Sequence, residues 1–187
     1  PACNHEWLAT PNSVIGNQTG CPFCYISRAE RLMNELLVAE TATFTREWKH
    51  ASCRDKLELP FDFYIAQWRE AIVPFILELD GSQHFDDTQN GADAFALNRS
   101  HDLHKMRWAL NRGIPVVRLT SRAVEFFNSS TWQAWIARVR DERIAPLAGR
   151  SVNQRKLIVL EDTPRYKQMF AECIESDPEL GPFVVFV

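Results

Sequence analysis

Two consecutive segments with strand-like patterns, residues 59–66 and 71–79, most constrain the fold of this chain. The first (LPFDFYIA) alternates apolar and polar side chains, which is the period of a half-buried strand. The second is apolar almost throughout, which predicts a central strand covered on both faces. Residues 67–70 are short enough to form a turn, so the two segments are predicted to pair as a hairpin. Pro74 cannot donate a hydrogen bond to a neighbouring strand, and we therefore expect a bulge or a one-sided gap there.

The segments on either side of this hairpin alternate between helix and strand patterns. Ser27 and Glu30 have the spacing of a capping box and precede leucines at helical spacing, which predicts a helix over residues 27–39. Further helices are expected over 97–111, 131–143 and 164–176, further strands over 41–48, 114–119, 156–160 and 183–187, and a loop over 81–96. The strand 114–119 follows a helix and should pair parallel through a crossover. The order predicts an α/β fold in which helices flank a mixed sheet.

Three acidic residues lie in the predicted hairpin. Asp62 and Glu78 are separated by 15 residues, so an early position in one strand meets a late position in its partner. Asp80 is two residues beyond Glu78 and shares its face of the strand. Solvent-facing strand ends are the alternative, but two acids interrupting an apolar run favour function. Because buried like charges need a counter-charge, the pattern predicts a divalent cation such as Mg²⁺.

A longer series of motifs resembles a known family. The series runs through Glu30, Asp62 in PFDFY, Glu78 and Asp80 in LELDG, Gln83-His84, Asp102, Lys105 and the strand IPVVRL. Over residues 27–122 it resembles the restriction-endonuclease-like PD-(D/E)XK superfamily, and within it the branch of very-short-patch repair endonucleases. The resemblance implies a restriction-endonuclease-like core and a metal-dependent DNA endonuclease that hydrolyses phosphodiester bonds.

The resemblance also implies a set of metal ligands. Asp62 and Glu78, together with the main-chain carbonyl of Leu79, would hold Mg²⁺ or Mn²⁺, and Glu30 would support the site from the first helix. The bound metal would polarise the phosphodiester and lower the pKa of its water. We therefore expect alanine at Asp62 or Glu78 to abolish DNA cleavage.

The chain departs from the superfamily at one position. The third position of the motif is usually lysine, and here it is Asp80. The group that orients the attacking water is therefore open, and the candidates are Gln83, His84 and Lys105. A lysine displaced onto the neighbouring helix is compatible with the pattern.

The histidines allow a second kind of metal centre. His101 and His104 lie three residues apart on the predicted helix 97–111, and both could face His84. Such a cluster would bind a transition metal. Hydrogen bonding of His104 beside a buried stripe is the plainer interpretation.

The N-terminal segment carries a zinc-binding pattern. Four candidate ligands occur within the first 24 residues: Cys3, His5, Cys21 and Cys24. A C-x-x-C pair beside proline and glycine is typical of two thiolates on one Zn²⁺, and the stretch also resembles small zinc ribbons. His5 is the least certain ligand, because in related ribbons a second cysteine precedes the first by three residues. The odd total of five cysteines argues against a disulfide framework and for a reducing compartment, cytoplasmic or nuclear.

Charge is unevenly distributed along the chain. Residues 1–97 contain 7 basic and 14 acidic side chains, whereas residues 98–155 contain 11 basic and 4 acidic ones. Arginine dominates the basic block, and its planar guanidinium suits phosphate. The candidate nucleic-acid-binding residues are Arg99, Arg107, Arg112, Arg118 and Arg122. We expect DNA as the partner, with salt-sensitive binding. No apolar run approaches the roughly 20 residues of a membrane span, so no membrane is expected.

Three regions follow from these patterns: a zinc-binding knuckle (1–26), a nuclease core (27–122) and a C-terminal α/β extension packed on the core (123–187). In the last region Trp132 and Trp135 could form part of the core or a stacking surface, and core is the favoured interpretation. Other domains of a longer chain, or a second copy, are further candidate partners. Two other functions stay open. One is a catalytically inactive nuclease-fold module that binds nucleic acid, favoured by Asp80 in place of lysine. The other is a zinc-organised domain whose acidic half faces a protein.

Overall fold

Six strands form one mixed β-sheet at the centre of the molecule. The computed structural model describes residues 27–69, 73–85 and 91–187. The strands are β1 (Thr43–Trp48), β2 (Phe61–Gln67), β3 (Phe75–Asp80), β4 (Val116–Thr120), β5 (Ile158–Leu160) and β6 (Val184–Phe186). They lie side by side in the order of the chain. The predicted mixed α/β architecture is confirmed.

The sheet changes direction at β3. The strands β1, β2 and β3 form an antiparallel meander, whereas β3, β4, β5 and β6 are parallel to one another. The predicted hairpin and the predicted parallel crossover into residues 114–119 are therefore both confirmed. The C-terminal segment adds β5 and β6 to this same sheet.

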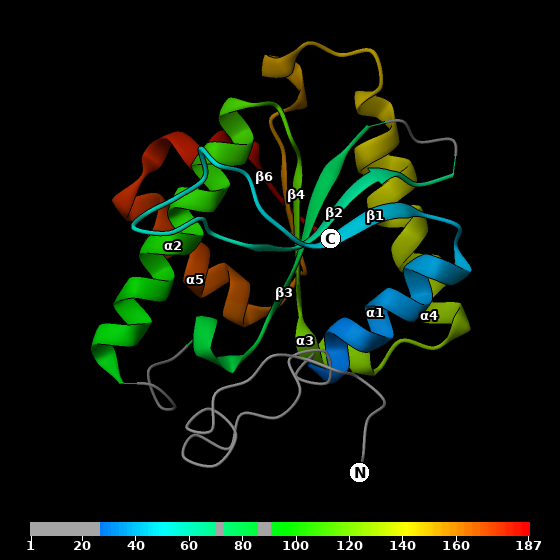
Figure 1. Cartoon of the computed structure of the whole chain (residues 1–187), viewed down its shortest axis with the longest axis horizontal. Coiled ribbons are helices and arrows are strands. Elements are labelled where there is room, and N and C mark those ends of the chain that lie inside the picture. The colour runs from blue at the N-terminus through cyan, green and yellow to red at the C-terminus, as the bar shows by residue number, and fades with distance from the viewer. Residues whose placement is uncertain (1–26, 70–72, 86–90) are drawn as a thin grey trace, which may run out of the picture.

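Helices cover both faces of the sheet (Figure 1). The α-helices are α1 (Arg28–Ala39), α2 (Ala92–Asn111), α3 (Ser121–Glu125), α4 (Ser129–Ile136) and α5 (Pro164–Ser176). Shorter 3₁₀ or π turns span Ser82–His84, Ala137–Ile144, Ala145–Leu147, Val152–Arg155 and Pro178–Phe183. In Figure 1, α2 and α5 lie on one side of the sheet, and α1 and α4 lie on the other.

Some predicted boundaries were wrong. Helix α2 begins at Ala92 rather than residue 97, because Gly91, at φ 80°, caps an alanine-rich first turn that we assigned to a loop. The expected bulge at Pro74 is not needed, since β3 begins one residue later at Phe75. Helix α3 was missed, and it starts where the Thr120 side chain accepts a hydrogen bond from the Ala123 amide.

The two faces of the sheet bury separate apolar clusters. Phe63, Leu77 and Val117 pack with residues of α1 and α4 on one face, whereas Ile158 and Leu160 pack against α2 and α5 on the other. Strand β3 is buried along its whole length, as the apolar run predicted.

The two tryptophans of α4 belong to the first of these clusters. The Trp132 side chain is buried, and its ring stacks on the partly buried Trp135 ring with 5.2 Å between centroids. Their prediction as core is confirmed. None of the helices in the described ranges combines the length and apolar character needed to cross a membrane.

Candidate metal centre

A cavity of about 380 Å³ opens where β2 begins and β3 ends. The residues that line it are Ser27, Glu30, Leu59, Pro60, Asp62, Glu78, Leu79, Gly81, Gln83, His84, Asn98, His101, Asp102, Lys105 and Ser121. This set brings together all of the predicted catalytic and magnesium-binding residues except Asp80. The elements that supply them are α1, β2, β3, the turn after β3, and α2.

Asp62 and Glu78 face each other across the hairpin. The paired residues Phe63 and Leu77 fix the register, and one further step along each strand puts Asp62 opposite Glu78. The Leu79 amide donates a hydrogen bond of 2.7 Å to Asp62 Oδ2. Burial, reinforced by the charge of Glu78, raises the pKa of Asp62 to about 8. Burial likewise raises the pKa of Glu78. Burial therefore disfavours the ionised form of both carboxyl groups, and a bound cation would stabilise that form.

Lys105 supplies a positive charge to this pair. Its Nζ lies 2.6 Å from Glu78 Oε1, and the side chains of both residues are largely buried. Burial works against the ammonium ion, but Glu78 and Asp62 outweigh it and raise the pKa of Lys105. Lys105 is the only partner of the Glu78 carboxylate among the described residues, so one ammonium group serves a carboxylate that can accept several contacts. A buried carboxylate oxygen is thus left with spare coordinating capacity.

Two more carboxylates approach Asp62 from the other side. Glu30, the third residue of α1, completes the predicted capping box with Ser27 and lies in the cavity wall. Glu47 was not predicted; one of its carboxylate oxygens lies within 4.8 Å of ligand atoms of both Glu30 and Asp62. Its φ of 49° interrupts the regular geometry of β1. The signal for Glu47 was an acid in a strand, which alone is too common to mark a site.

Asp80 lies apart from this group, although it shares the strand. Arg118 of β4 donates to both of its oxygens, at 2.8 and 2.6 Å, and the Tyr166 hydroxyl donates a third hydrogen bond of 2.6 Å to Oδ2. All three side chains are almost fully buried. Asp80 is therefore neutralised by a bidentate ion pair.

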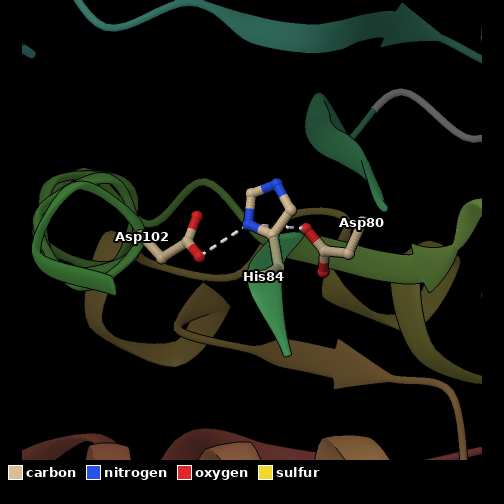
Figure 2. A group of neighbouring side chains, drawn as sticks. All are labelled: Asp80, His84 and Asp102. Atoms are coloured by element: carbon tan, nitrogen blue, oxygen red, sulfur yellow. Dashed lines mark hydrogen bonds and ion pairs between the residues drawn. The ribbon is translucent and has the colours of Figure 1, made fainter. Parts of the chain in front are cut away.

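His84 and Asp102 form a hydrogen-bonded pair at the edge of the cavity. His84 Nδ1 lies 2.9 Å from Asp102 Oδ2 and 3.6 Å from Asp80 Oδ1. Figure 2 shows Nδ1 directed at Asp102, with the second ring nitrogen on the opposite side of the imidazole. Because a carboxylate accepts, Nδ1 carries the proton and Nε2 is a free acceptor in the neutral ring. Burial lowers the pKa of His84, but the hydrogen bond that His84 donates to Asp102 and the charges of Asp80 and Asp102 outweigh it, so the pKa is raised.

The Asp80, His84 and Asp102 cluster could itself be considered for a metal, since its ligand atoms lie within 4.8 Å of one another. Arg118 already occupies the position of the cation: besides its bond to Asp80, its guanidinium lies 2.9 Å from Asp102 Oδ1. Burial opposes ionisation of Asp102, but Arg118 and His84 outweigh it and lower the pKa of Asp102. Arg118 contacts both carboxylates of this group, and Tyr166 and His84 add hydrogen bonds to them, whereas Lys105 contacts Glu78 alone.

The five candidate DNA-binding arginines are dispersed. Arg118 is 2% exposed and held by Asp80 and Asp102. Arg99 pairs with Glu172 at 2.6 Å, and Arg107 pairs with Asp177. Arg112 lies over the Trp108 ring and donates to Ser52 Oγ. Arg122 is exposed beside Phe126, outside the cavity.

The remaining predicted ligands divide into two groups. Of the histidines, His84 and His101 are among the described side chains lining the cavity, whereas His104 is exposed on α2. The three histidines therefore do not share one site. The four predicted zinc ligands, Cys3, His5, Cys21 and Cys24, lie outside the described residues.

Comparison with family models, curated proteins and solved structures finds no significant match to this chain.

Proposed function

We propose that this protein is a DNA endonuclease that uses Mg²⁺ or Mn²⁺ held by Asp62 and Glu78, on a core of the restriction-endonuclease-like kind. The observation that carries the proposal is the pairing of two buried carboxylates on neighbouring strands, which both have raised pKa values and which have one lysine as their cationic neighbour. His84 and its partner Asp102 stand at the edge of the same cavity. A cation site beside a potential base is the arrangement that metal-assisted phosphodiester hydrolysis needs.

The donor set fits Mg²⁺. Asp62 and Glu78 would contribute carboxylate oxygens and Leu79, which also lines the cavity, its main-chain carbonyl; hard oxygen ligands are those that Mg²⁺ prefers. One or two carboxylates are its usual protein share, with water and phosphate completing the shell. Glu30 and Glu47 would bind the outer waters of the ion from the side of Asp62.

Each residue of the cavity then has a chemical task. When bound, the metal lowers the pKa of a coordinated water and offsets charge on the phosphate. Nε2 of His84 accepts the proton that the attacking water loses, and Asp102 holds the ring and stabilises the imidazolium. Lys105 Nζ, 2.6 Å from Glu78 Oε1, would place a positive charge beside the bound phosphate and stabilise the negative charge on its oxygens. Asp80 takes no part in the chemistry and balances Arg118.

The position of Lys105 supports the resemblance to the PD-(D/E)XK superfamily. The lysine usually found two residues after the second acid is replaced here by Asp80. Lys105 reaches Glu78 from α2 instead, so a lysine ammonium group is still present in the cavity. The strand position itself is occupied by Asp80, which forms a buried ion pair with Arg118.

The test is cleavage of supercoiled plasmid with Mg²⁺ or Mn²⁺. Asp62→Asn and Glu78→Gln should each lower the cleavage rate by at least a hundredfold, because each removes a charged ligand while keeping the shape of the side chain. Glu58→Gln, an exposed acid in the loop before β2, is the matched control and should cleave at the wild-type rate. Full activity of the Asp62 or Glu78 variant would refute the assignment.

One observation favours a second function, a catalytically inactive module that binds nucleic acid. Lys105 already neutralises Glu78, as it would in a cavity that never takes a metal. The same assay separates the two. An inactive module would retard DNA in a gel but leave plasmid intact at every Mg²⁺ and Mn²⁺ concentration.

A further inference from the structure

A second cavity, of about 500 Å³, lies beside the metal centre at the carboxyl ends of β4 and β5. It is lined on one side by Arg122 and Phe126, which belong to α3 and its end, and on the other by Pro164 and Arg165 at the start of α5. None of these four residues takes part in the chemistry proposed above.

The two cavities adjoin through consecutive residues. Thr120 lines the second cavity, and the next residue, Ser121, lines the metal centre. Arg165 lines the second cavity and also a third, smaller cavity of about 150 Å³, where its guanidinium lies 5.8 Å from the centre of the Phe85 ring. The linings of the metal centre and the second cavity therefore meet at Thr120 and Ser121.

The lining combines an exposed aromatic ring with unbalanced positive charge. Phe126 is 69% exposed, the largest such value for an aromatic side chain in the described ranges, and the Arg122 guanidinium lies 5.7 Å from the centre of its ring. The only acid in the lining, Glu161, is engaged internally: its Oε2 accepts hydrogen bonds of 2.8 Å from the amide and the hydroxyl of Thr120. A lone exposed apolar residue needs no explanation, but an exposed ring beside Arg122, in a cavity that Arg165 also lines, does.

We propose that this cavity binds an unpaired nucleotide of the DNA strand that enters the metal centre. Its base stacks on Phe126, and the phosphates on either side contact Arg122 and Arg165. Stacking requires a base whose face is free, and in a duplex the neighbouring base pairs cover that face. The inference rests on the proposed nuclease function and names its substrate class: DNA with unpaired bases next to the cleaved phosphate, as in an overhang, a flap or a bubble.

The experiment measures binding of a fluorescein-labelled 12-nucleotide oligo(dT) to the full chain by anisotropy, in buffer without added Mg²⁺ or Mn²⁺ so that nothing is cut. Wild type should bind the single strand more tightly than a duplex of the same length. Phe126→Ala should weaken single-strand binding roughly tenfold, the usual effect of losing one stacked base, whereas Phe126→Trp should preserve it. Leu57→Ala, an exposed apolar residue in the loop before β2, is the control and should bind as wild type does.

The arginines are tested by salt dependence. Replacing Arg122 and Arg165 together by glutamine should reduce the slope of log K against log salt by about 1.4, since each single-strand phosphate contact contributes roughly 0.7. Unchanged binding by Phe126→Ala, with thermal unfolding as in wild type, would overturn the proposal. So would equal affinity for single strand and duplex.

The two proposals fail separately. If the protein binds oligo(dT) through Phe126 but never cleaves DNA, the nucleotide site is supported and the nuclease function is rejected. If the protein cleaves DNA through Asp62 and Glu78 but binds oligo(dT) independently of Phe126, the nuclease function is supported and the nucleotide site is rejected.

Discussion

Asp102 controls the protonation and the direction of His84, which makes this pair the most informative contact at the scale of single residues. Asp102 Oδ2 lies 2.9 Å from His84 Nδ1 and accepts the proton of that nitrogen in a hydrogen bond. This contact raises the pKa of the imidazole against the effect of burial. A general base must be neutral to act, so cleavage should rise with pH through a pKa above the ordinary value for histidine.

We predict that Asp102→Asn lowers the pKa of His84, because the amide keeps the shape of Asp102 but removes its negative charge. NMR titration of the histidine ring protons checks this, with His84 assigned from His84→Gln. The pH profile of cleavage should shift to lower pH, with a reduced maximum, since the imidazolium loses its partner. An unchanged pKa of His84 would contradict the role given to Asp102.

Residue-level prediction from sequence succeeded where the signal was local. Asp62 and Glu78 were predicted to converge because strand pairing and register follow from pattern. The role of Asp80 could not be foreseen, since its partner Tyr166 is 86 residues away in the sequence and no local pattern predicts that contact. Arg118 gave a weak signal, as a single charge inside an apolar strand, which we assigned to DNA rather than to a buried ion pair.

At the scale of elements, capping residues define where the helices begin. Ser27 and Glu30 form the capping box that their spacing predicted. Helix α4 has a similar start, in which the Asn128 side chain accepts hydrogen bonds of 3.0 Å from the amides of Ser130 and Thr131. That start was placed two residues late from sequence, at Thr131, because an Asn-Ser-Ser stretch also reads as a turn.

Asn128→Ala should lower the free energy of unfolding by about 1 kcal/mol, the usual cost of removing an N-cap side chain. Asn128→Asp keeps an acceptor at the same position and should change it by less than about half of that. Urea denaturation of the two variants against wild type measures both effects. Equal stability of Asn128→Ala and wild type would show that the cap contributes nothing. Because Asn128 is exposed and remote from the cavity lining, plasmid cleavage should be unaffected.

At the scale of the whole molecule, the sheet brings the carboxylates of Asp62, Glu78 and Asp80 together where β2 begins and β3 ends. The change from antiparallel to parallel pairing at β3 puts the end of that strand beside β2 on one side and β4 on the other. On the β4 side Arg118 balances Asp80, and on the β2 side Asp62 and Glu78 share Lys105. The folded chain should therefore be stabilised by a cation that binds between Asp62 and Glu78, where burial raises the pKa of both carboxylates.

Mg²⁺ at a hundredfold excess over its Kd should add about 2.7 kcal/mol to stability, which raises Tm by about 5–10 °C in a chain of this size. In Asp62→Asn the metal should have little effect on Tm. Without metal, this variant should melt at or above the wild-type temperature. Because burial raises the pKa of Asp62 to about 8, folding must either protonate this carboxyl or bury its charge, and asparagine avoids both costs. Differential scanning calorimetry measures both, with Glu58→Gln as the control that should respond to Mg²⁺ as wild type does. A Tm that Mg²⁺ raises equally in wild type and Asp62→Asn would rule out Asp62 as a ligand.

The central claim is that the metal binds between Asp62 and Glu78 and not in the neighbouring group of Asp80, His84 and Asp102. Anomalous diffraction from crystals grown with Mn²⁺ tests it most directly. The account predicts one peak within about 2.0–2.4 Å of a carboxylate oxygen of Asp62 and of Glu78 and of the Leu79 carbonyl oxygen. A peak bound instead by Asp80, His84 and Asp102, or the absence of any peak in the cavity at saturating Mn²⁺, would contradict it.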